Sequence, residues 1–375
     1  MSRPRLGIGL IGTGFMGLSH ALAWAAAART FDLPAAIDLV AVADINEAHA
    51  ASCAARWGFS RASGDWQSLI ADPAISVISI TAPNALHHPM AMAAIAAGKH
   101  VHCEKPLAPS TAQAREMTEA ARAAGVKTQV GFNYLCNPLF SFAKAMIEGG
   151  ELGQIISFRG IHAEDYMADP AAPYSFRHAP EGGGVAGDLG SHIFATAEYL
   201  CGPISRLLGD QLTVTPERTT PQGERKAVEV DDISRAFLRF ESGASGSLEA
   251  SWVATGRKMQ HDWEIYGTKG ALAFSQERFS ELRYFNAGDP AGRQGFRRIE
   301  AGPDHAPYKE FCVAPGHQLG FNDLKTIEMA RFAAAIAGDL PEPFGFAAGM
   351  RVQALLESLS HSAKSGTWAD IPAKV

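Results

Sequence analysis

A glycine-rich turn between an apolar run and a helix-forming stretch constrains this chain more than any other feature. The apolar run is Leu6–Ile11, the turn is Gly12-Thr13-Gly14-Phe15-Met16-Gly17, and Leu18–Trp24 follows. The first glycine permits a sharp turn, the second lets the backbone approach a pyrophosphate, and the third allows the helix to pack closely on the strand. The first amide groups of the helix would face the anion. We therefore predict that Gly12, Gly14, Phe15, Met16 and Gly17 bind a dinucleotide; a tight turn without a ligand is the alternative.

The composition indicates a large, moderately charged chain. Its 375 residues are enough for two domains with sizeable cores. Charged residues make up 19% of the sequence, the formal net charge is -6, and neither sign forms a long run, so we expect neither a nucleic acid nor a membrane as partner. The sequence passes from Arg3 and Arg5 straight into the first apolar run, so we expect no cleavable leader. Five scattered cysteines without a C-x-x-C pair fit reduced thiols, and we expect a cytoplasmic location.

Up to about residue 130, short apolar strands alternate with Ala-rich helical stretches. The predicted strands are Leu6–Ile11, Leu39–Ala43, Val77–Thr81, His100–Cys103 and Thr128–Val130. The predicted helices include Asn46–Trp57, Pro89–Ala97 and Thr111–Ala124. This alternation is typical of a parallel sheet with helices on both faces. We therefore predict an α/β dinucleotide-binding domain of the Rossmann type over residues 1–130.

After about residue 150 the pattern changes to sequential strands. They are predicted over Gln154–Glu164, Arg206–Thr215, Asp232–Phe240, Ser245–Val253, Asp262–Tyr266, Ala271–Phe274 and Glu281–Phe285. Helices are predicted over Asp188–Leu200, Asn322–Ala337 and Ala347–Ser362. In Asp232–Phe240, Ala236, Leu238 and Phe240 form a period-two apolar face. We therefore predict an α+β domain over residues 131–375, with a large, mainly antiparallel sheet covered on one face.

A carboxylate after the second predicted strand indicates which dinucleotide is bound. Asp44 ends this strand, and Ile45 and Asn46 follow where an arginine would favour a phosphate. A carboxylate here can bind ribose hydroxyls and would repel a 2′-phosphate, at about 4 kcal/mol for unit charges 4 Å apart under intermediate screening. We predict NAD rather than NADP, with Asp44 and Ile45 at its adenosine end. Asp44 lies 27 positions after Gly17, which we attribute to a long first helix and loop; a solvated acid is the alternative.

Thr81, Asn84 and His87 follow another predicted strand, and the carboxyl ends of strands line the ligand crevice of a doubly wound sheet. We predict that all three contact the cofactor. Asn84 is equally consistent with a cap of the helix near Pro89. The histidines of this region lack Cys, Asp or Glu partners at ligand spacing, so we predict no metal site.

Glu104-Lys105-Pro106 also follows a predicted strand, and we expect Glu104 and Lys105 beside the cofactor. Lys105 is a candidate for polarising a substrate oxygen, with ordinary surface charge as the alternative. Farther along, Asp188 and His192 are four residues apart and would share one face of a helix. A histidine suits proton transfer near neutral pH, and a carboxylate beside it orients the ring. The alternatives are a capping Asp with an ordinary helix-face His, or half of a metal site.

Taken together, these motifs resemble those of the Gfo/Idh/MocA family, named after glucose–fructose oxidoreductase, inositol dehydrogenase and a rhizopine catabolism protein. The resemblance spans nearly the whole chain and rests on Gly12–Gly17, Asp44, Thr81–His87, Glu104-Lys105-Pro106, Gly131-Phe132-Asn133-Tyr134, Gly150-Glu151-Leu152-Gly153 and Gly182–His192. It implies a Rossmann domain joined to an open-faced α+β domain, and association through the second sheet as a dimer or homotetramer. Unlike periplasmic glucose–fructose relatives, the chain shows no twin-arginine leader, so we expect an enzyme with exchangeable cofactor.

The resemblance implies that Lys105, Asp188 and His192 act together as catalytic residues. His192 would take the hydroxyl proton, Lys105 would stabilise the alkoxide, and Asp188 would bind substrate and fix His192. The implied reaction is NAD-dependent oxidation of a secondary or anomeric hydroxyl of a cyclic polyol or sugar, such as an inositol, levoglucosan or an aldose. A glycosidase of the same fold, using transient oxidation and elimination, is one alternative. A non-catalytic NAD-binding regulator is another, and the joint presence of the three residues argues against it.

Polar and aromatic segments supply candidates for further substrate contacts. With Lys105, Asp188 and His192, we predict substrate-binding roles for Tyr134, Asp165, Arg177 and His317. For Arg177 and His317 the alternative is an ordinary surface residue. A pocket that pairs every substrate hydroxyl discriminates by about 10⁴-fold, because a missing partner leaves buried polar groups unpaired. The identity of the substrate is therefore set by loops whose conformation the sequence does not give.

Overall fold

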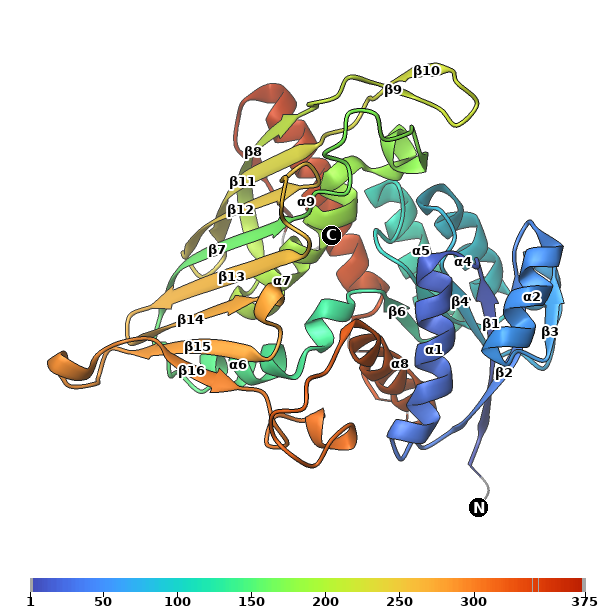
Figure 1. Cartoon of the computed structure of the whole chain (residues 1–375), viewed down its shortest axis with the longest axis horizontal. Helices are drawn as coiled ribbons and strands as arrows, with labels where there is room; N and C mark the ends of the chain where they lie inside the picture. Colours follow the sequence, from blue (N-terminus) through green and yellow to red (C-terminus); the bar gives the residue numbers. More distant parts are fainter. Residues whose placement is uncertain (1–2, 339, 343, 373–375) are drawn as a thin grey trace. The chain divides into compact units, whose positions relative to one another are not determined.

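The computed structural model describes residues 3–338, 340–342 and 344–372 of the chain (Figure 1). Packing divides the chain into two compact units. Unit 1 consists of Met1–Cys136 and Gly320–Met350, and unit 2 consists of Asn137–Leu319 and Arg351–Val375. Each unit therefore draws on two stretches that are far apart in the sequence.

Within the described residues, unit 1 contains a six-stranded, wholly parallel sheet in the order β3-β2-β1-β4-β5-β6. Its strands are β1 Arg5–Ile11, β2 Ala36–Ala43, β3 Arg61–Ser63, β4 Val77–Ile80, β5 His100–Cys103 and β6 Thr128–Val130. In β4, Val77, Ile78 and Ile80 are completely buried, as expected for a strand covered on both faces. The strand order reverses between β1 and β4, which is the switch point where such sheets bind ligands.

The helices of unit 1 alternate with its strands along the chain, apart from α8, and in α5 the sequence marks both ends. They are α1 Phe15–Thr30, α2 Glu47–Trp57, α3 Trp66–Ala71, α4 His87–Ala96, α5 Thr111–Ala124 and α8 Phe321–Ala337. At the start of α5, the side chain of Ser110 accepts a hydrogen bond from the backbone of Gln113 at 3.3 Å. At its end, Gly125 takes the left-handed conformation with φ 66°.

Helix α8 belongs to unit 1, although it lies far along the sequence. Its residues Met329, Phe332 and Ala333 are buried in one cluster with Trp24 of α1 and Ile8 of β1. The Trp24 and Phe332 ring centroids are 6.4 Å apart. The sequence-based division at residue 130 assigned this stretch to the second domain, because a periodic pattern shows that a helix has an apolar face but does not show its partner.

In the part of the chain that the structure describes, unit 2 contains a nine-stranded sheet in the order β16-β15-β14-β13-β7-β12-β11-β8-β17. Its strands are β7 Ile155–Ala163, β8 Ile204–Leu212, β11 Ile233–Phe240, β12 Ser245–Ser251, β13 Gln260–Gly267, β14 Gly270–Ser275, β15 Glu281–Asn286, β16 Arg297–Glu300 and β17 Ala369–Asp370. Neighbours are antiparallel except β7 and β12, which run parallel. The predicted fold class, a Rossmann sheet plus a large and mainly antiparallel sheet, is confirmed.

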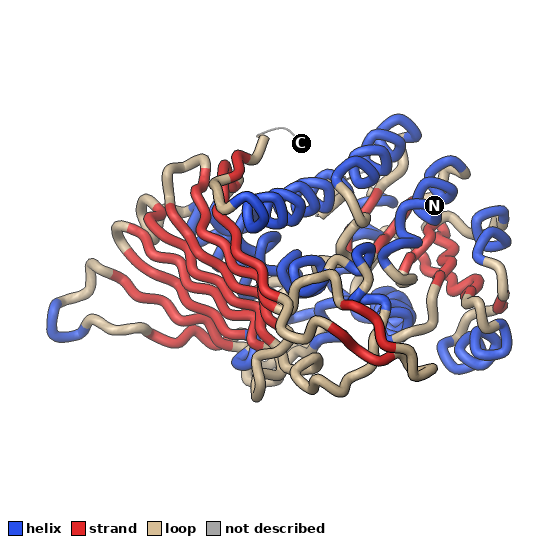
Figure 2. The backbone as a smooth tube through the Cα atoms, turned by 90° about the horizontal axis from the view of Figure 1, so that it is seen from above, coloured by secondary structure: helices blue, strands red, loops and turns tan. Residues whose placement is uncertain are grey.

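Helices cover one face of this sheet, and Figure 2 shows its strands side by side with helix along one side. The helices are α6 Pro138–Glu148, α7 Ser191–Cys201 and α9 Phe346–Ser365, the last with residues 351–365 in unit 2. In β11, Ala236, Leu238 and Phe240 are buried, whereas Phe237 on the other face is 61% exposed. Helix α9 approaches β8 so closely that a Cβ at Gly209 would lie 2.7 Å from Leu359.

Several short elements were absent from the sequence-based prediction. They are β3, α3, α6, β16, β17 and a two-stranded hairpin of β9 Glu217–Thr219 with β10 Arg225–Ala227. Most are too short to show a period, and β9, β10 and β16 fall in stretches rich in polar residues. The strand predicted over Arg206–Thr215 runs over Ile204–Leu212, and the helix predicted from Asp188 begins as an α-helix only at Ser191.

Removing the buried ring of Phe332 tests the assignment of α8 to unit 1. We expect Phe332→Ala to lower the free energy of unfolding by about 3–5 kcal/mol, because it leaves a cavity against Trp24. Urea denaturation followed by fluorescence measures this change. Phe296→Ala, at a side chain 48% exposed, is the control and should change stability by about 0.5 kcal/mol or less. An equally small change for both variants would contradict the packing described here.

Candidate active site

The glycine turn after β1 has the geometry that an anion-binding turn requires. Gly12 has φ 100° and donates its backbone N–H to the Ala43 carbonyl at 2.8 Å. A Cβ at Gly12 would lie 2.8 Å from the Thr81 hydroxyl oxygen, and a Cβ at Gly17 would overlap the Gly12 carbonyl. At Gly14, by contrast, an added Cβ would have no atom of the described chain within 4 Å. The turn is therefore tight at its first and third glycines and open at the second, where a pyrophosphate approaches the backbone.

The start of α1 leaves its first amide groups available to a ligand. Gly14 occupies the N-cap position, and in the described structure no side chain caps this end. Uncapped amide groups at the start of a helix of 16 residues favour a bound phosphate. Nearby, Phe15 is 73% exposed and Ile45 is 96% exposed, and both are apolar surfaces suited to a planar ring. These features fit a dinucleotide.

Asp44 is held in place at the end of β2. Its Oδ2 accepts hydrogen bonds from the Thr13 backbone N–H at 3.0 Å and the Thr13 hydroxyl at 2.5 Å, and its Oδ1 accepts one from the Asn46 backbone at 3.1 Å. Burial alone would raise the pKa of Asp44, but these hydrogen bonds outweigh it and lower the pKa. Asp44 is therefore an anion fixed beside the glycine turn. The 16 residues of α1 and the eight of β2 account for its long spacing from Gly17.

Thr81, Asn84 and His87 all follow β4, but their surroundings differ. The Thr81 hydroxyl donates to the carbonyls of Ile11 and Gly12, each at 3.0 Å, and so supports the glycine turn. Asn84 begins a short 3-10 turn, and the N-cap residue of α4 is Leu86, so Asn84 does not cap that helix.

His87 is completely buried, with its ring nitrogens 2.9 Å from the carbonyl oxygens of Pro106 and Ala82. Burial lowers the pKa of His87. Both ring nitrogens thus face backbone carbonyls. His87 therefore connects the loops after β4 and β5, and its contact with the cofactor stays a prediction.

Glu104 is 5% exposed, and its carboxylate accepts hydrogen bonds from other residues of the protein. Oε1 accepts hydrogen bonds from His20 Nε2 and from the Lys325 ammonium, both at 2.8 Å. Oε2 accepts the backbone N–H of Lys105 at 3.2 Å. Burial would raise the pKa of Glu104, but Lys325 and His20 hold it well below its usual value. Glu104 therefore fixes the backbone of Lys105, and the Lys105–Pro106 bond is cis.

The same buried network extends to β5 and α8. Lys325 also pairs with Glu328 Oε2 at 2.9 Å, and Glu328 Oε1 accepts from His102 Nε2 at 2.6 Å. The other ring nitrogen of His20 lies 2.8 Å from the Ser79 hydroxyl. We call His20, Ser79, His102, Glu104, Lys325 and Glu328 the Glu104 cluster. Sequence reasoning missed it, although Lys325 and Glu328 lie three residues apart on one helix with an apolar face, which was the available signal.

A group of aromatic rings lies at the start of α8 in unit 1. Phe15 stacks on Phe321 with ring centroids 5.7 Å apart, and Tyr134 is 6.3 Å from the same ring. Tyr134 is 8% exposed. Of the predicted substrate-binding residues, Lys105 and Tyr134 therefore belong to unit 1, whereas the others belong to unit 2.

In unit 2, Asp188 and His192 lie at the start of α7 and are mostly buried. Asp188 sits in a π-helical turn, Ala186–Gly190, that runs directly into the helix. Its Oδ2 accepts the Tyr166 hydroxyl at 2.7 Å and Arg177 Nε at 2.9 Å. Desolvation and the negative charge of Asp188 raise the pKa of Tyr166. Burial alone would lower the pKa of Arg177, but the ion pair with Asp188 outweighs burial and raises that pKa. Asp188 is thus an anion held by two donors.

Two other histidines surround the ring of His192, which is 6% exposed. Its centroid is 5.5 Å from that of His162 and 6.5 Å from that of His261. His162 lies with Nδ1 3.1 Å from the Leu189 carbonyl and Nε2 3.4 Å from Glu164. His261 contacts the Thr196 hydroxyl at 3.0 Å, and burial lowers its pKa well below the usual value. Among described residues, no group of three or more His, Cys, Asp or Glu has metal-binding geometry.

Asp165 and His317, also predicted to bind substrate, have different surroundings in unit 2. Asp165 Oδ2 accepts the Lys258 ammonium at 2.6 Å and the Gly256 backbone at 3.0 Å, and the lysine contact lowers its pKa. His317 is exposed and lines a cavity of about 210 Å³ together with Glu281, among others. Asp165 thus tethers the loop that carries Tyr166, while His317 borders a separate small cavity. Their contact with substrate stays a prediction.

Comparison with known proteins follows the same division of the chain. The oxidoreductase family with an NAD-binding Rossmann fold, Gfo/Idh/MocA, matches residues 6–132, and the C-terminal domain of that family matches residues 140–273. The chain is 38% identical to levoglucosan dehydrogenase of Pseudarthrobacter phenanthrenivorans, with 98% of each chain covered. It is 26% identical to scyllo-inositol 2-dehydrogenase (NAD(+)) of Bacillus subtilis, over 80% of this chain and 78% of that one.

Solved structures agree with these relatives. A levoglucosan dehydrogenase in complex with NADH and L-sorbose matches with a TM-score of 0.96 and 39% identity, over 99% of this chain and 100% of that one. Fold and site define an NAD-dependent oxidoreductase, and NAD is its cofactor. The chain belongs to the Gfo/Idh/MocA family, as the motif resemblance indicated. In the described part of the chain, no helix has the length and apolar character to cross a bilayer.

Removing the Asp44 charge tests how the site selects NAD. We expect Asp44→Asn to weaken NAD binding several-fold and to lower the preference for NAD over NADP by at least about 10-fold, because repulsion of the 2′-phosphate is lost. Titrations with NADH and NADPH followed by fluorescence measure both affinities. Asp38→Asn, on the same strand but paired with Arg5 at the surface, should change neither. An unchanged preference in Asp44→Asn would contradict this role.

Proposed function

We propose that this enzyme oxidises a secondary or anomeric hydroxyl of a cyclic polyol or sugar with NAD, and that its substrate is of the levoglucosan type. The observation that carries the proposal lies at the start of α7 in unit 2, where the buried His192 follows four residues after Asp188, a carboxylate that two donors hold. The alignment with a levoglucosan dehydrogenase over 98% of both chains supports the same class of substrate.

The proposed roles follow from the chemistry of each side chain. Oxidation removes a hydride from carbon and a proton from the hydroxyl, and a C=O double bond forms; bound NAD supplies the hydride acceptor. His192 takes the proton, which typically contributes about 10²–10⁴-fold to the rate. The Lys105 ammonium donates a hydrogen bond to the same oxygen and stabilises its developing negative charge.

Asp188 acts on His192 through its charge. Because Tyr166 and Arg177 both donate to Oδ2, the carboxylate is stabilised as an anion near neutral pH. An anion on the preceding turn favours the imidazolium that forms when His192 accepts the proton. In this proposal Arg177 positions Asp188, a role that the sequence did not indicate, and Tyr134, Asp165 and His317 remain candidates for substrate contact.

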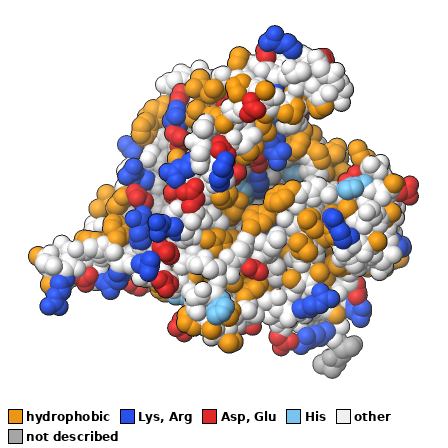
Figure 3. Space-filling model, in the orientation of Figure 1, with side chains coloured by type: hydrophobic (Ala, Val, Ile, Leu, Met, Phe, Trp, Pro, Cys, Tyr) orange, Lys and Arg blue, Asp and Glu red, His pale blue; other side chains and the backbone are white. Residues whose placement is uncertain are grey.

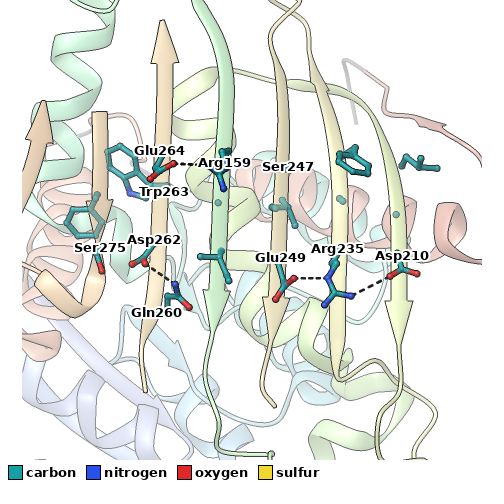
Figure 4. A pocket seen from close by; sticks show the side chains of 18 of the residues that line it. Arg159, Asp210, Arg235, Ser247, Glu249, Gln260, Asp262, Trp263, Glu264 and Ser275 are labelled. Atoms are coloured by element: carbon teal, nitrogen blue, oxygen red, sulfur yellow. Dashed lines mark hydrogen bonds and ion pairs between the residues drawn. The ribbon is translucent and has the colours of Figure 1, made fainter. Parts of the chain in front are cut away.

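We also propose that the enzyme is a cytoplasmic homo-oligomer that associates through the open face of the unit 2 sheet. A shallow cavity of about 700 Å³ lies on this face. Figure 4 shows Arg235 between Glu249 and Asp210, at 2.7 and 3.7 Å, and Arg159 directed to Glu264. Figure 3 shows basic and acidic side chains interspersed over the strands, so the face suits a second copy of itself in a dimer or tetramer.

A substrate screen tests the proposed reaction. With excess NAD, we expect NADH to accumulate at 340 nm with levoglucosan, an inositol or an aldose. Lys105→Met and His192→Ala should each lower kcat by at least about 100-fold while NAD remains bound, because they remove the hydrogen-bond donor and the base. Lys309→Met and His88→Ala, at surface positions, are the matched controls.

The outcome also separates the alternative reactions. Accumulation of NADH in proportion to product supports a dehydrogenase. Cleavage of a glycoside without net NADH would instead indicate a glycosidase with transient oxidation. Unchanged turnover in both Lys105→Met and His192→Ala would contradict the assigned roles.

A charge placed on the open sheet face tests the proposed association. We expect Phe237→Asp to lower the molar mass measured by light scattering to that of a smaller assembly or monomer, because a carboxylate would be buried without a partner. Val313→Asp, at a side chain 86% exposed outside this sheet, is the control and should leave the mass unchanged. The same mass for both variants and the wild type would place the interface elsewhere.

A further inference from the structure

The Glu104 cluster is a group of buried ionisable side chains whose charges do not cancel. His20, His102, Lys325 and Glu328 are each completely buried, and Glu104 is 5% exposed. The cluster connects α1, β4, β5 and α8 within unit 1. A buried charge is costly unless it is paired, so the balance of charge here calls for an explanation.

The surroundings of His20 favour its neutral form. Its Nε2 faces the Glu104 carboxylate, which only accepts, and its Nδ1 faces the Ser79 hydroxyl, which is able to donate to the ring while it accepts from Trp24 Nε1 at 3.4 Å. A ring with one donor and one acceptor nitrogen is the uncharged tautomer. Burial and the nearby Lys325 ammonium also lower the pKa of His20 to about 4.

The hydrogen bonds of His102 also fit a neutral ring. Its Nε2 donates to Glu328, whereas its Nδ1 has no hydrogen-bond partner among the described residues. A protonated ring would leave a second N–H group buried without an acceptor, which is costlier than a bare lone pair. The ring of His20 also lies 4.7 Å from that of His102, a distance that disfavours charge on both.

The remaining ionised groups are two carboxylates and one ammonium. Glu104 and Glu328 share Lys325 between them, and that contact holds the pKa of both carboxyls down despite burial, while raising the pKa of Lys325. With both histidine rings neutral, the six residues of the cluster carry a net charge of about −1. The thiols of Cys103 and Cys136 add no charge, because burial raises the pKa of each.

This negative charge lies under the edge of the sheet at which the cofactor binds. Ser79 is next to the last residue of β4, and Glu104 follows the last residue of β5. His20 lies three residues after Gly17, the last glycine of the turn. A Cβ at Gly131, just after β6, would lie 2.5 Å from Glu104 Oε1, so the backbone packs directly on the carboxylate.

We propose that the Glu104 cluster is the counter-charge that lets the oxidised, cationic nicotinamide share the crevice with the Lys105 ammonium, and that it thereby favours NAD⁺ over NADH. The part that concerns Lys105 rests on the proposed function. Oxidised nicotinamide carries a positive charge and reduced nicotinamide carries none, so a fixed nearby anion acts on one form only. Its effect is large because interactions between buried charges are weakly screened.

Neutralising each carboxylate tests the proposal by binding alone, with no substrate present. In Glu328→Gln and Glu104→Gln, we expect the Kd of NAD⁺ to rise on the order of 10-fold while the Kd of NADH changes by less than about 2-fold. Calorimetry measures NAD⁺ and fluorescence measures NADH. Glu116→Gln is the matched control, because Glu116 also pairs with a histidine, His88 at 2.8 Å, but at the surface. Thermal unfolding checks that each variant is folded.

Lys105→Met provides a test in the opposite direction that does not disturb the buried cluster. Without the ammonium, the cluster charge is unopposed, and we expect the ratio of the NAD⁺ Kd to the NADH Kd to fall several-fold. A parallel rise of both Kd values in the glutamine variants, or no change, would overturn the proposal and assign the cluster a purely structural role. The ratio of the two Kd values could change in the glutamine variants and stay the same in Lys105→Met. That result would support the role of the cluster but show that Lys105 does not lie near the nicotinamide, and it would contradict the proposed mechanism rather than the inference.

Discussion

The organisation of unit 1 depends on the hydrogen bonds and the ion pair that the buried Glu104 carboxylate makes. It is buried at the end of β5 and joins His20 of α1, Lys325 of α8 and the backbone of Lys105. A buried carboxylate without such partners would destabilise the unit by several kcal/mol, so these elements are constrained to meet at this point. The constraint explains why a helix from residues 321–337 completes a domain that begins at the N-terminus.

Unit 2 also contains a mostly buried carboxylate that donors of the protein hold, Asp188 at the start of α7. The anion of Asp188 is held by Tyr166 and Arg177 on the loop before the helix, and the carboxylate of Asp165 ties that loop to Lys258. Arg218, only 2% exposed, donates to the carbonyls of Met167, Asp169 and Ala172 in the same loop. In the proposed mechanism His192 accepts the proton at the start of this helix, and a prearranged anion at Asp188 reduces the reorganisation that catalysis requires.

The sequence predicted features whose cause is local. The glycine turn follows from a left-handed Gly12 and a crowded Gly17, and the face of β11 follows from alternation at Ala236, Leu238 and Phe240. It did not predict contacts between distant positions, because no local pattern specifies the partner: His20 and Lys325 reach Glu104 across 84 and 221 positions. For the same reason the ion pair between Arg177 and Asp188 was not predicted, and the contact of Arg177 with substrate stays a prediction. The strand β17 was missed because its two residues show no period.

We propose that the Lys105 ammonium and the His192 imidazole act on one hydroxyl oxygen of the substrate. A crystal structure of the enzyme with NADH and a bound sugar tests this claim most directly. The account predicts that Lys105 Nζ and a ring nitrogen of His192 both lie within about 3.2 Å of the same substrate oxygen. Side chains of Lys105 and His192 that face separate cavities, or a sugar bound away from both, would contradict it.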